Sequence, residues 1–265
     1  GQQPFTRVTL LREVLFRQKW YLLGEKFLLP VLHAQVFPLS DSSLAVYGVN
    51  EAIEPRLTRA DRLLYDKVAP LLRDRPEEAI RLVQAGLQAD SSPAFHLLIG
   101  NLSYQADHLE QAEQSLNRAI EALPSFRRAY RTLGLTHIRQ ERFKDSIPTW
   151  LKVITLGGGD AQSYGLLAYA YLSEEKYASA LSAYRMARMF APDSLDFRRG
   201  EARCLLASNQ FLPAIALFDE LIAEHPGQGS YWRLQANAYL GLERYADAAA
   251  NLEIARALGG KDAEA

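Results

Sequence analysis

Few residues in this chain have types and spacings that could support chemistry. The run Gly157-Gly158-Gly159-Asp160 is the nearest match to a phosphate-binding loop, but no Lys-Ser or Lys-Thr pair follows it. We interpret the run as a turn that uses the freedom of glycine at positive φ. Cys204 is the single cysteine, so it cannot form an internal disulfide. Its place in an apolar helical stretch predicts a small core residue rather than a nucleophile.

The histidines are too dispersed along the chain to suggest a shared metal site. No His-Glu-x-x-His zinc helix and no Gly-x-Ser-x-Gly nucleophile turn occurs in the sequence. We therefore predict a protein that is not an enzyme and needs no cofactor. Two of the histidines lie in mostly apolar helical stretches, and we expect both to be packed, hydrogen-bonded core residues: His96 and His137.

Composition narrows the remaining classes of function. A net charge of −1 over 265 residues argues against a protein that binds polyanions over its whole surface. The longest apolar stretch, Trp20 to His33, contains Glu25, Lys26 and Pro30 and falls short of the roughly 20 residues a membrane span needs. We predict a soluble chain. Because the sequence begins Gly1-Gln2-Gln3, removal of a signal peptide is compatible with it. A single cysteine is compatible with either a reducing compartment or export.

The elements that position these residues recur every 34 residues. When the 34-residue segments are aligned with one another, one position holds a small residue in every segment; these positions form the small column. The position three residues earlier holds leucine or an aromatic residue in every segment and forms a second column. Proline ends three of the segments. A fixed period of this length is typical of solenoids built from repeated supersecondary units. The small column is Ala112, Ser146, Ala180, Ala214 and Ala248, the second is Leu109, Phe143, Tyr177, Phe211 and Tyr245, and the prolines are Pro124, Pro192 and Pro226.

Each repeated segment predicts two antiparallel helices. In the segment 161–194, Tyr164, Leu167 and Tyr171 follow the i, i+3, i+7 spacing of one helical face. A polar turn at 174–176 separates this helix from a second helix at 177–190. The small column lies where two helices cross closely, since a larger side chain there would push their backbones apart.

This pattern resembles the tetratricopeptide repeat (TPR) family. In the segment 161–194, the residues that match the family signature are Tyr164, Leu167, Ala168, Tyr171, Ala180, Tyr184, Ala187 and Pro192. The resemblance implies an all-α, right-handed α-solenoid of helix-turn-helix repeats with an N-terminal helical extension. The implied units are an extension or cap at 1–58, a degenerate repeat at 59–92, and repeats at 93–126, 127–160, 161–194, 195–228 and 229–262.

The N-terminal segment has its own pattern. Residues 7–29 and 41–53 are expected to form helices. Thr58 is expected to cap a helix over 59–72, with Asp61 completing a capping box. The segment 1–58 either covers the first face of the solenoid or mediates association, including a homodimer through these helices.

Two charged residues depart from the family pattern. Arg198 and Glu201 occupy slots that are normally apolar. Because they are three residues apart on one helix, we expect them to form a salt bridge with each other.

The resemblance implies that the first helix of each repeat lines a concave groove. When the groove positions of the family are carried over to this chain one by one, they hold six arginines and one aspartate. This excess of positive charge would suit an acidic or C-terminal segment of a protein partner. The alternative is that these arginines pair with carboxylates of neighbouring helices. Arg233 and Asn237 match a Lys/Asn pair of chaperone-binding members, but the adjacent repeat lacks the remaining clamp residues. The candidate partner-binding residues are Asn101, Tyr104, Arg128, Arg131, Arg139, Tyr169, Arg199, Arg203, Arg233 and Asn237.

A second resemblance concerns cellular context. The stretches 126–134, 164–169 and 235–242 look like bacterial TPR proteins associated with TonB/ExbB/ExbD transport. That resemblance implies a periplasmic location and an envelope partner, with a cytoplasmic location as the alternative. The predicted function is a non-catalytic adaptor or scaffold. The alternatives are a protein that binds single-stranded nucleic acid through the same arginines with Tyr104 and Tyr169, and a non-catalytic domain of a larger enzyme or transporter assembly.

Overall fold

The computed structural model describes residues 54–259, and the helices expected at 7–29 and 41–53 lie outside this range. The described part is helical, without strands. Its elements are α3 (Arg59–Val68), η1 (Ala69–Leu71), α4 (Pro76–Gly86), α5 (Ala94–Gln105), α6 (Leu109–Ala122), α7 (Arg127–Arg139), α8 (Phe143–Val153), η2 (Ile154–Gly158), α9 (Ala161–Ser173), α10 (Tyr177–Phe190), α11 (Leu195–Ala207), α12 (Phe211–Glu224), α13 (Gly229–Gly241) and α14 (Tyr245–Gly259).

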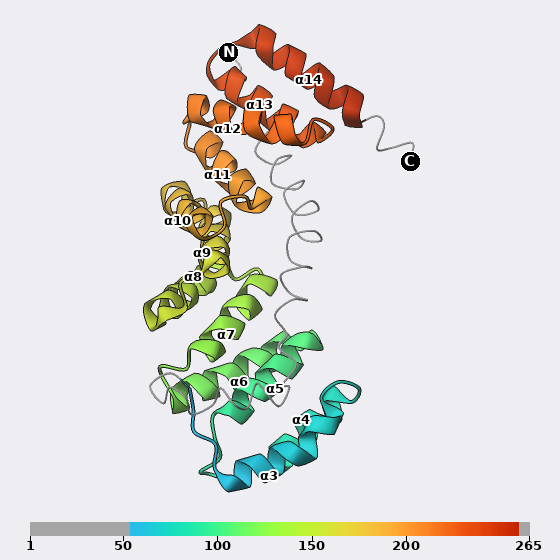
Figure 1. Ribbon diagram of the computed structural model, residues 1–265, viewed down its shortest axis with the longest axis vertical. Coiled ribbons are helices and arrows are strands. Elements are labelled where there is room, and N and C mark those ends of the chain that lie inside the picture. The colour runs from blue at the N-terminus through green and yellow to red at the C-terminus, as the bar shows by residue number, and fades with distance from the viewer. Residues whose placement is uncertain (1–53, 260–265) are drawn as a thin grey trace, which may run out of the picture.

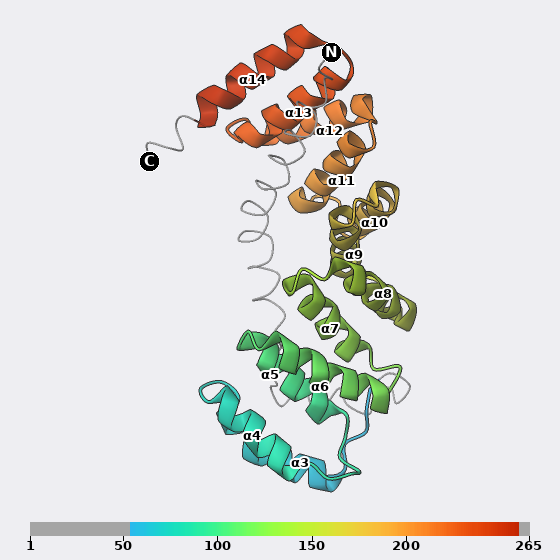
Figure 2. The same ribbon diagram turned by 180° about the vertical axis from the view of Figure 1, so that it is seen from behind.

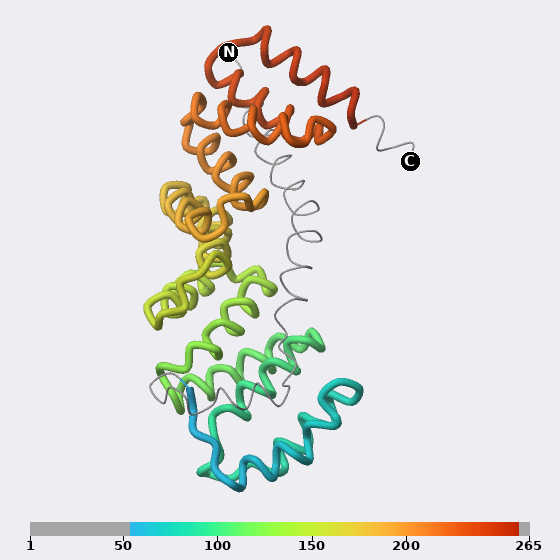
Figure 3. The backbone as a smooth tube through the Cα atoms, viewed as in Figure 1, coloured from blue at the N-terminus to red at the C-terminus, as the bar shows by residue number. Residues whose placement is uncertain are grey.

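Successive helix pairs stack side by side along an arc. The arc runs from α3 and α4 at one end to α13 and α14 at the other (Figure 1), and its regular helix-turn-helix path is clearest in the backbone tube (Figure 3). Views from the front and the back place α8 and α10 on the outer side and α7, α9 and α11 on the inner side (Figures 1 and 2). This arrangement confirms the prediction of an all-α solenoid.

The small column predicted from the repeat period sits where the helices of each pair approach most closely. Its five members are at most 1% exposed. Glycine also allows close approach of the two helices in the pairs that begin with α5 and α7. A Cβ on Gly100 would collide with Leu116, and a Cβ on Gly134 would collide with Trp150. Close packing therefore depends on the absence of side-chain volume at these positions.

The turn between the two helices of each pair also repeats every 34 residues. In the five pairs from α5 and α6 to α13 and α14, one residue of each turn has a positive φ, between 56° and 64°, although none of these residues is glycine. The next amide closes a six-residue ring, as in the 2.8 Å bond from the His108 amide to the Ser103 carbonyl. This is a Schellman ending, which satisfies carbonyls left unpaired at the helix end. The five residues are Asp107, Glu141, Glu175, Asn209 and Glu243.

The glycine run forms the turn between two helix pairs. Gly157 has φ 79°, in the region that favours glycine, as the sequence predicts. The guanidinium of Arg127 donates to the carbonyls of Leu156 and Gly157 at 3.3 and 3.0 Å. Arg127 therefore fastens the turn to the start of α7.

The start of the described helices follows the predicted capping box. Thr58 Oγ1 accepts from the Asp61 amide at 3.1 Å, and an Asp61 carboxylate oxygen accepts from the Thr58 amide at 2.8 Å. The other Asp61 oxygen accepts from the Ser92 amide at 3.2 Å, which ties this cap to the chain just before α5. The helix is shorter than expected: α3 ends at Val68 and continues as the turn η1, where Pro70 cannot supply an amide to an α-helix.

The prediction that Arg198 and Glu201 form a salt bridge with each other is wrong. Glu201, 6% exposed, instead accepts from Arg185 and Arg188 of α10, and Arg198 donates to Glu224 of α12 with one contact at 2.6 Å. Each residue has a partner on a neighbouring helix. Spacing along α11 could not reveal those partners.

Candidate protein-binding face

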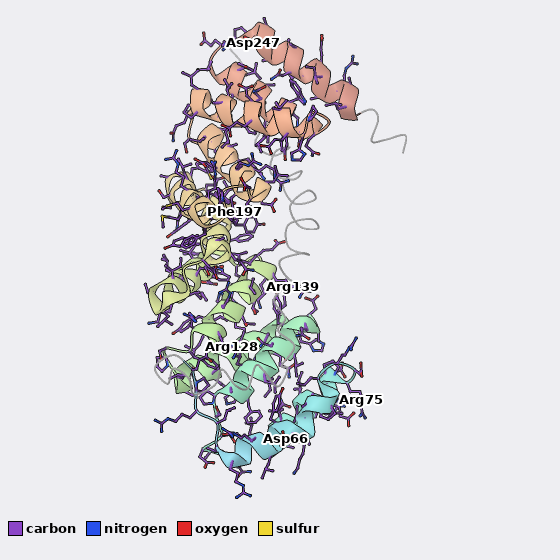
Figure 4. All side chains as sticks on the ribbon, in the orientation of Figure 1. Asp66, Arg75, Arg128, Arg139, Phe197 and Asp247 are labelled. Atoms are coloured by element: carbon purple, nitrogen blue, oxygen red, sulfur yellow. The ribbon has the colours of Figure 1, made fainter. Side chains whose placement is uncertain are left out.

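The ten predicted partner-binding residues all lie on the first helices of the pairs: α5, α7, α9, α11 and α13. Contacts between α5 and α7, between α9 and α11, and between α11 and α13 bring these helices together. Figure 4 marks two of the ten residues, Arg128 and Arg139, on α7. The surroundings of the arginines divide the set into two halves.

Arg128 faces a buried carboxylate that precedes the first described helix. Its guanidinium lies 3.7 Å from Glu54, which is 5% exposed. Burial raises the pKa of the Glu54 carboxyl, and the Arg128 and Arg127 guanidinium groups oppose that shift. Arg128 therefore neutralises a charge inside the protein.

Arg131 links two adjacent helix pairs. It donates to the Asp160 carboxylate and to the Gln162 side-chain oxygen, each at 2.8 Å. Asp160 also caps α9 by accepting from the Ser163 amide at 2.7 Å. Although partial burial acts to raise it, the pKa of Asp160 is lowered by the Ser163 amide and the Arg131 guanidinium. The side chain of Arg131 is committed to holding the α7–α9 junction.

Arg139, Tyr104 and Asn101 join α5 to α7. Arg139 pairs with Asp107 at 3.0 Å, donates to the Tyr104 carbonyl at 3.0 Å and lies over the Tyr104 ring at 5.2 Å. Tyr104 is 4% exposed, and burial raises the pKa of its hydroxyl to about 12. Asn101 accepts from Thr132 of α7 at 2.9 Å. These three residues stabilise the stacking of the helices.

The alternative drawn from the sequence, that the arginines pair with carboxylates, therefore holds for Arg128, Arg131 and Arg139. Their partners are Glu54, Asp107 and Asp160, which lie in connecting segments rather than on the first-helix face. These carboxylates cannot be found from the residues of the first helices alone.

The arginines of α11 and α13 have different surroundings. Arg199 pairs with Asp196 on its own helix at 3.0 Å. Within residues 54–259, neither Arg203 nor Arg233 forms a hydrogen bond or an ion pair. Arg233 is exposed, and Asn237, one turn further along α13, is half-buried. The part of the face formed by Arg199, Arg203, Arg233 and Asn237 is called the α11–α13 face below.

Arg203 carries a charge that its surroundings do not balance. Burial lowers the pKa of its guanidinium and the neighbouring Arg199 adds to that shift, whereas Tyr184, Cys204 and Tyr169 oppose it. Tyr169 of α9, 8% exposed, lies edge-on to Phe143, with ring centres 5.5 Å apart, and burial raises the pKa of its hydroxyl. Cys204 is fully buried, in agreement with its predicted place in the core.

The two core histidines predicted from the sequence differ from each other. His137 is 6% exposed and lies 3.4 Å from Glu113 and 3.4 Å from Thr149. His96 is only half-buried and makes no hydrogen bond with residues of the described range, so that part of the prediction is wrong. Burial lowers the pKa of both imidazoles.

Among residues 54–259, no group of three or more His, Cys, Asp or Glu side chains is placed to hold a metal ion. None of the helices in this range is long and apolar enough to span a bilayer.

Family models described as tetratricopeptide repeat match residues 72–125, 97–163, 131–194 and 171–238, which together cover more than half of the chain. No curated protein sequence matches.

Several solved structures share the fold. YrrB, titled a TPR protein with an unusual peptide-binding site, is 19% identical with a TM-score of 0.60, over 70% of this chain and 92% of that one. MamA of Desulfovibrio magneticus RS-1 is 18% identical with a TM-score of 0.57, over 65% and 98%. A tetratricopeptide repeat protein from Parabacteroides merdae is 15% identical with a TM-score of 0.58, over 77% and 86%.

Proposed function

This chain belongs to the tetratricopeptide repeat family, and we propose that it is a non-catalytic scaffold whose α11–α13 face binds an acidic or C-terminal segment of a protein partner. The observation that carries the proposal is that, within residues 54–259, two of the six arginines lack the carboxylate partner that the other four have. Arg128, Arg131 and Arg139 have carboxylate partners, whereas Arg203 and Arg233 have none within the described range. An anionic ligand would therefore gain most at α11 and α13.

The chemistry of these side chains suits a peptide carboxylate. A guanidinium offers two parallel donors to a carboxylate, and such charge-assisted bonds are shorter and stronger than neutral ones. Because Arg203 is partly withdrawn from water and lies beside Arg199, a carboxylate would also relieve repulsion between two cations. The Asn237 amide can both donate to and accept from an extended peptide backbone.

The fold supports this mode of binding. YrrB shares the fold and is titled as having a peptide-binding site. For the present chain, an envelope partner and a periplasmic location rest on the sequence resemblance to TPR proteins of TonB/ExbB/ExbD systems, and we propose them as the context in which to seek the partner.

The test uses charge reversal with a matched control. Proteins that co-purify with the chain from membrane and soluble extracts are tiled as fluorescent peptides, and binding is measured by anisotropy. The double variant R203E/R233E should weaken the binding of acidic peptides at least tenfold. Arg118 is exposed on α6 and lies outside the α11–α13 face, so R118E should bind as the wild type does.

Two results would contradict the proposal. One is unchanged peptide binding by a folded R203E/R233E variant. The other is tight, salt-sensitive binding of single-stranded RNA, which would favour the nucleic-acid alternative because phosphate contacts weaken steeply as salt is added.

A further inference from the structure

The last described helix, α14, has one side that no other described helix covers. It packs against α13 at the end of the arc (Figures 1 and 2), where Ala248 and Asn251 are 1% and 8% exposed. A different side carries four residues at the i, i+4, i+7, i+11 spacing of a helical stripe. All four are exposed, Tyr245 by 65% and Leu252 by 41%. The α14 seam is defined as Tyr245, Ala249, Leu252 and Arg256.

The earlier helix pairs bury the residues that correspond to Leu252 of this seam. The four residues that precede Leu252 at intervals of 34 are between 0% and 3% exposed: Leu116, Trp150, Tyr184 and Phe218. Leu252 is therefore an apolar residue at a position that is buried between helices in earlier pairs, but here it is exposed to solvent.

The contact between α10 and α11 shows what a covering helix does. A Cβ on Gly200 of α11 would collide with the Tyr184 ring, so α11 lies directly over Tyr184. Arg188, which corresponds to Arg256, pairs with Glu201 of α11. Arg256 itself has no ion pair with any residue from 54 to 259. The seam thus fits a further helix, in continuity with the stacking interfaces of the fold.

The seam is complementary to itself when two copies run antiparallel. A twofold axis between Ala249 and Leu252 places the alanine of one copy opposite the leucine of the other, so that two helices can approach closely. The same axis places Tyr245 opposite Arg256, where a guanidinium can lie over an aromatic ring. Both pairings occur twice in a symmetric contact.

We propose that the α14 seam is the surface through which two copies of this chain associate, as a twofold-symmetric antiparallel helix pair. The contact is separate from the α11–α13 face, so either proposal can fail alone. One helix per copy gives a small interface, and the association is therefore weak and reversible.

The primary test is the mass of the full chain in solution. Sedimentation equilibrium should show a rise with concentration from the 29.7 kDa monomer toward twice that mass. L252E should raise the dissociation constant at least tenfold while leaving the helical signal and unfolding midpoint unchanged. Leu212 is 66% exposed on α12, and L212E adds the same charge outside the seam, so its dissociation constant should match that of the wild type.

Crosslinking tests the geometry. The variants A249C and L252C, mixed under oxidising conditions, should form an intermolecular disulfide faster than either variant alone, because the antiparallel register places each position opposite the other. A parallel pairing would instead favour each variant with itself and would overturn the proposed geometry.

Two outcomes would overturn the proposal itself. One is a chain that stays monomeric at all concentrations, which would leave the seam for a different partner helix. The other is a dimer that L252E does not weaken, as expected if association runs through residues 1–58.

Discussion

Removing the charge of Glu201 should destabilise the protein far more than removing that of an exposed carboxylate. The Glu201 side chain is 8% exposed and holds Arg185 and Arg188, which are 58% and 30% exposed. E201Q keeps the side-chain volume but leaves both guanidinium groups facing a neutral amide. Any change in stability therefore reports the loss of charge rather than a cavity.

The magnitude follows from these exposures. Breaking a fully buried ion pair costs about 3–5 kcal/mol because the remaining charge is stranded. Arg185 can recover its hydration, and Arg188 can do so in part, so we expect a loss of about 2 kcal/mol. For a chain of this size such a loss lowers the thermal midpoint by roughly 4–8 °C.

The assay is urea unfolding followed by both circular dichroism and tryptophan fluorescence. Repeat proteins can unfold in parts, and the tryptophan signal includes Trp150 on α8 and Trp232 on α13, which lie on either side of α11 and α12. The control is D247N, which removes the exposed pair between Arg244 and Asp247 and should produce no measurable change. High salt should preserve the effect of E201Q, because buried pairs are screened less. An E201Q midpoint within error of the wild type would refute the reasoning.

Three further predictions concern the turns and the histidines. G157A should lose about 1 kcal/mol in urea unfolding because φ is 79° at Gly157, whereas G159A, at φ −75°, should lose less; equal losses would contradict the role of the positive φ. E141G should gain about 0.5 kcal/mol, because Glu141 holds φ 61° at a helix end where glycine is preferred, and a loss of stability would argue against a strained turn. Burial lowers the pKa of His96 and His137 below the ordinary 6.5, so the unfolded chain binds more protons there and stability should fall as the pH drops below about 6.5; H96Q/H137Q should flatten that dependence, and an unchanged pH profile would count against it.

Much of the solenoid could be predicted because its signals are local. The capping box of Thr58 and Asp61 depends on residues three apart, and the 34-residue period with its small column repeats often enough along the chain to be visible without knowing the contacts. The Schellman turns escaped prediction because glutamate, aspartate and asparagine occupy positions where glycine is the usual signal.

The sequence left the roles of the candidate face residues undivided. Resemblance to the family placed the ten residues on the first helices, and the structure agrees with that placement. Resemblance could not separate Arg131, which pairs with Asp160, from Arg203, which has no such partner within the described range. Both are arginines on the same face of equivalent helices. The difference lies in what the connecting segments bring close to them.

The sequence by itself therefore determined the fold class, the repeat register and the positions of the core residues, because periodic burial leaves a periodic pattern in the chain. The tertiary structure alone decided which charges are already balanced. Arg128 meets Glu54, and Arg139 meets Asp107, across gaps in the sequence that no helical spacing links. The tertiary structure also decided that Leu252, whose counterparts are buried in the four preceding pairs, lies exposed at the end of the described arc. Burial and charge balance are properties of neighbours in space, and the folded arrangement of the repeats creates those neighbours.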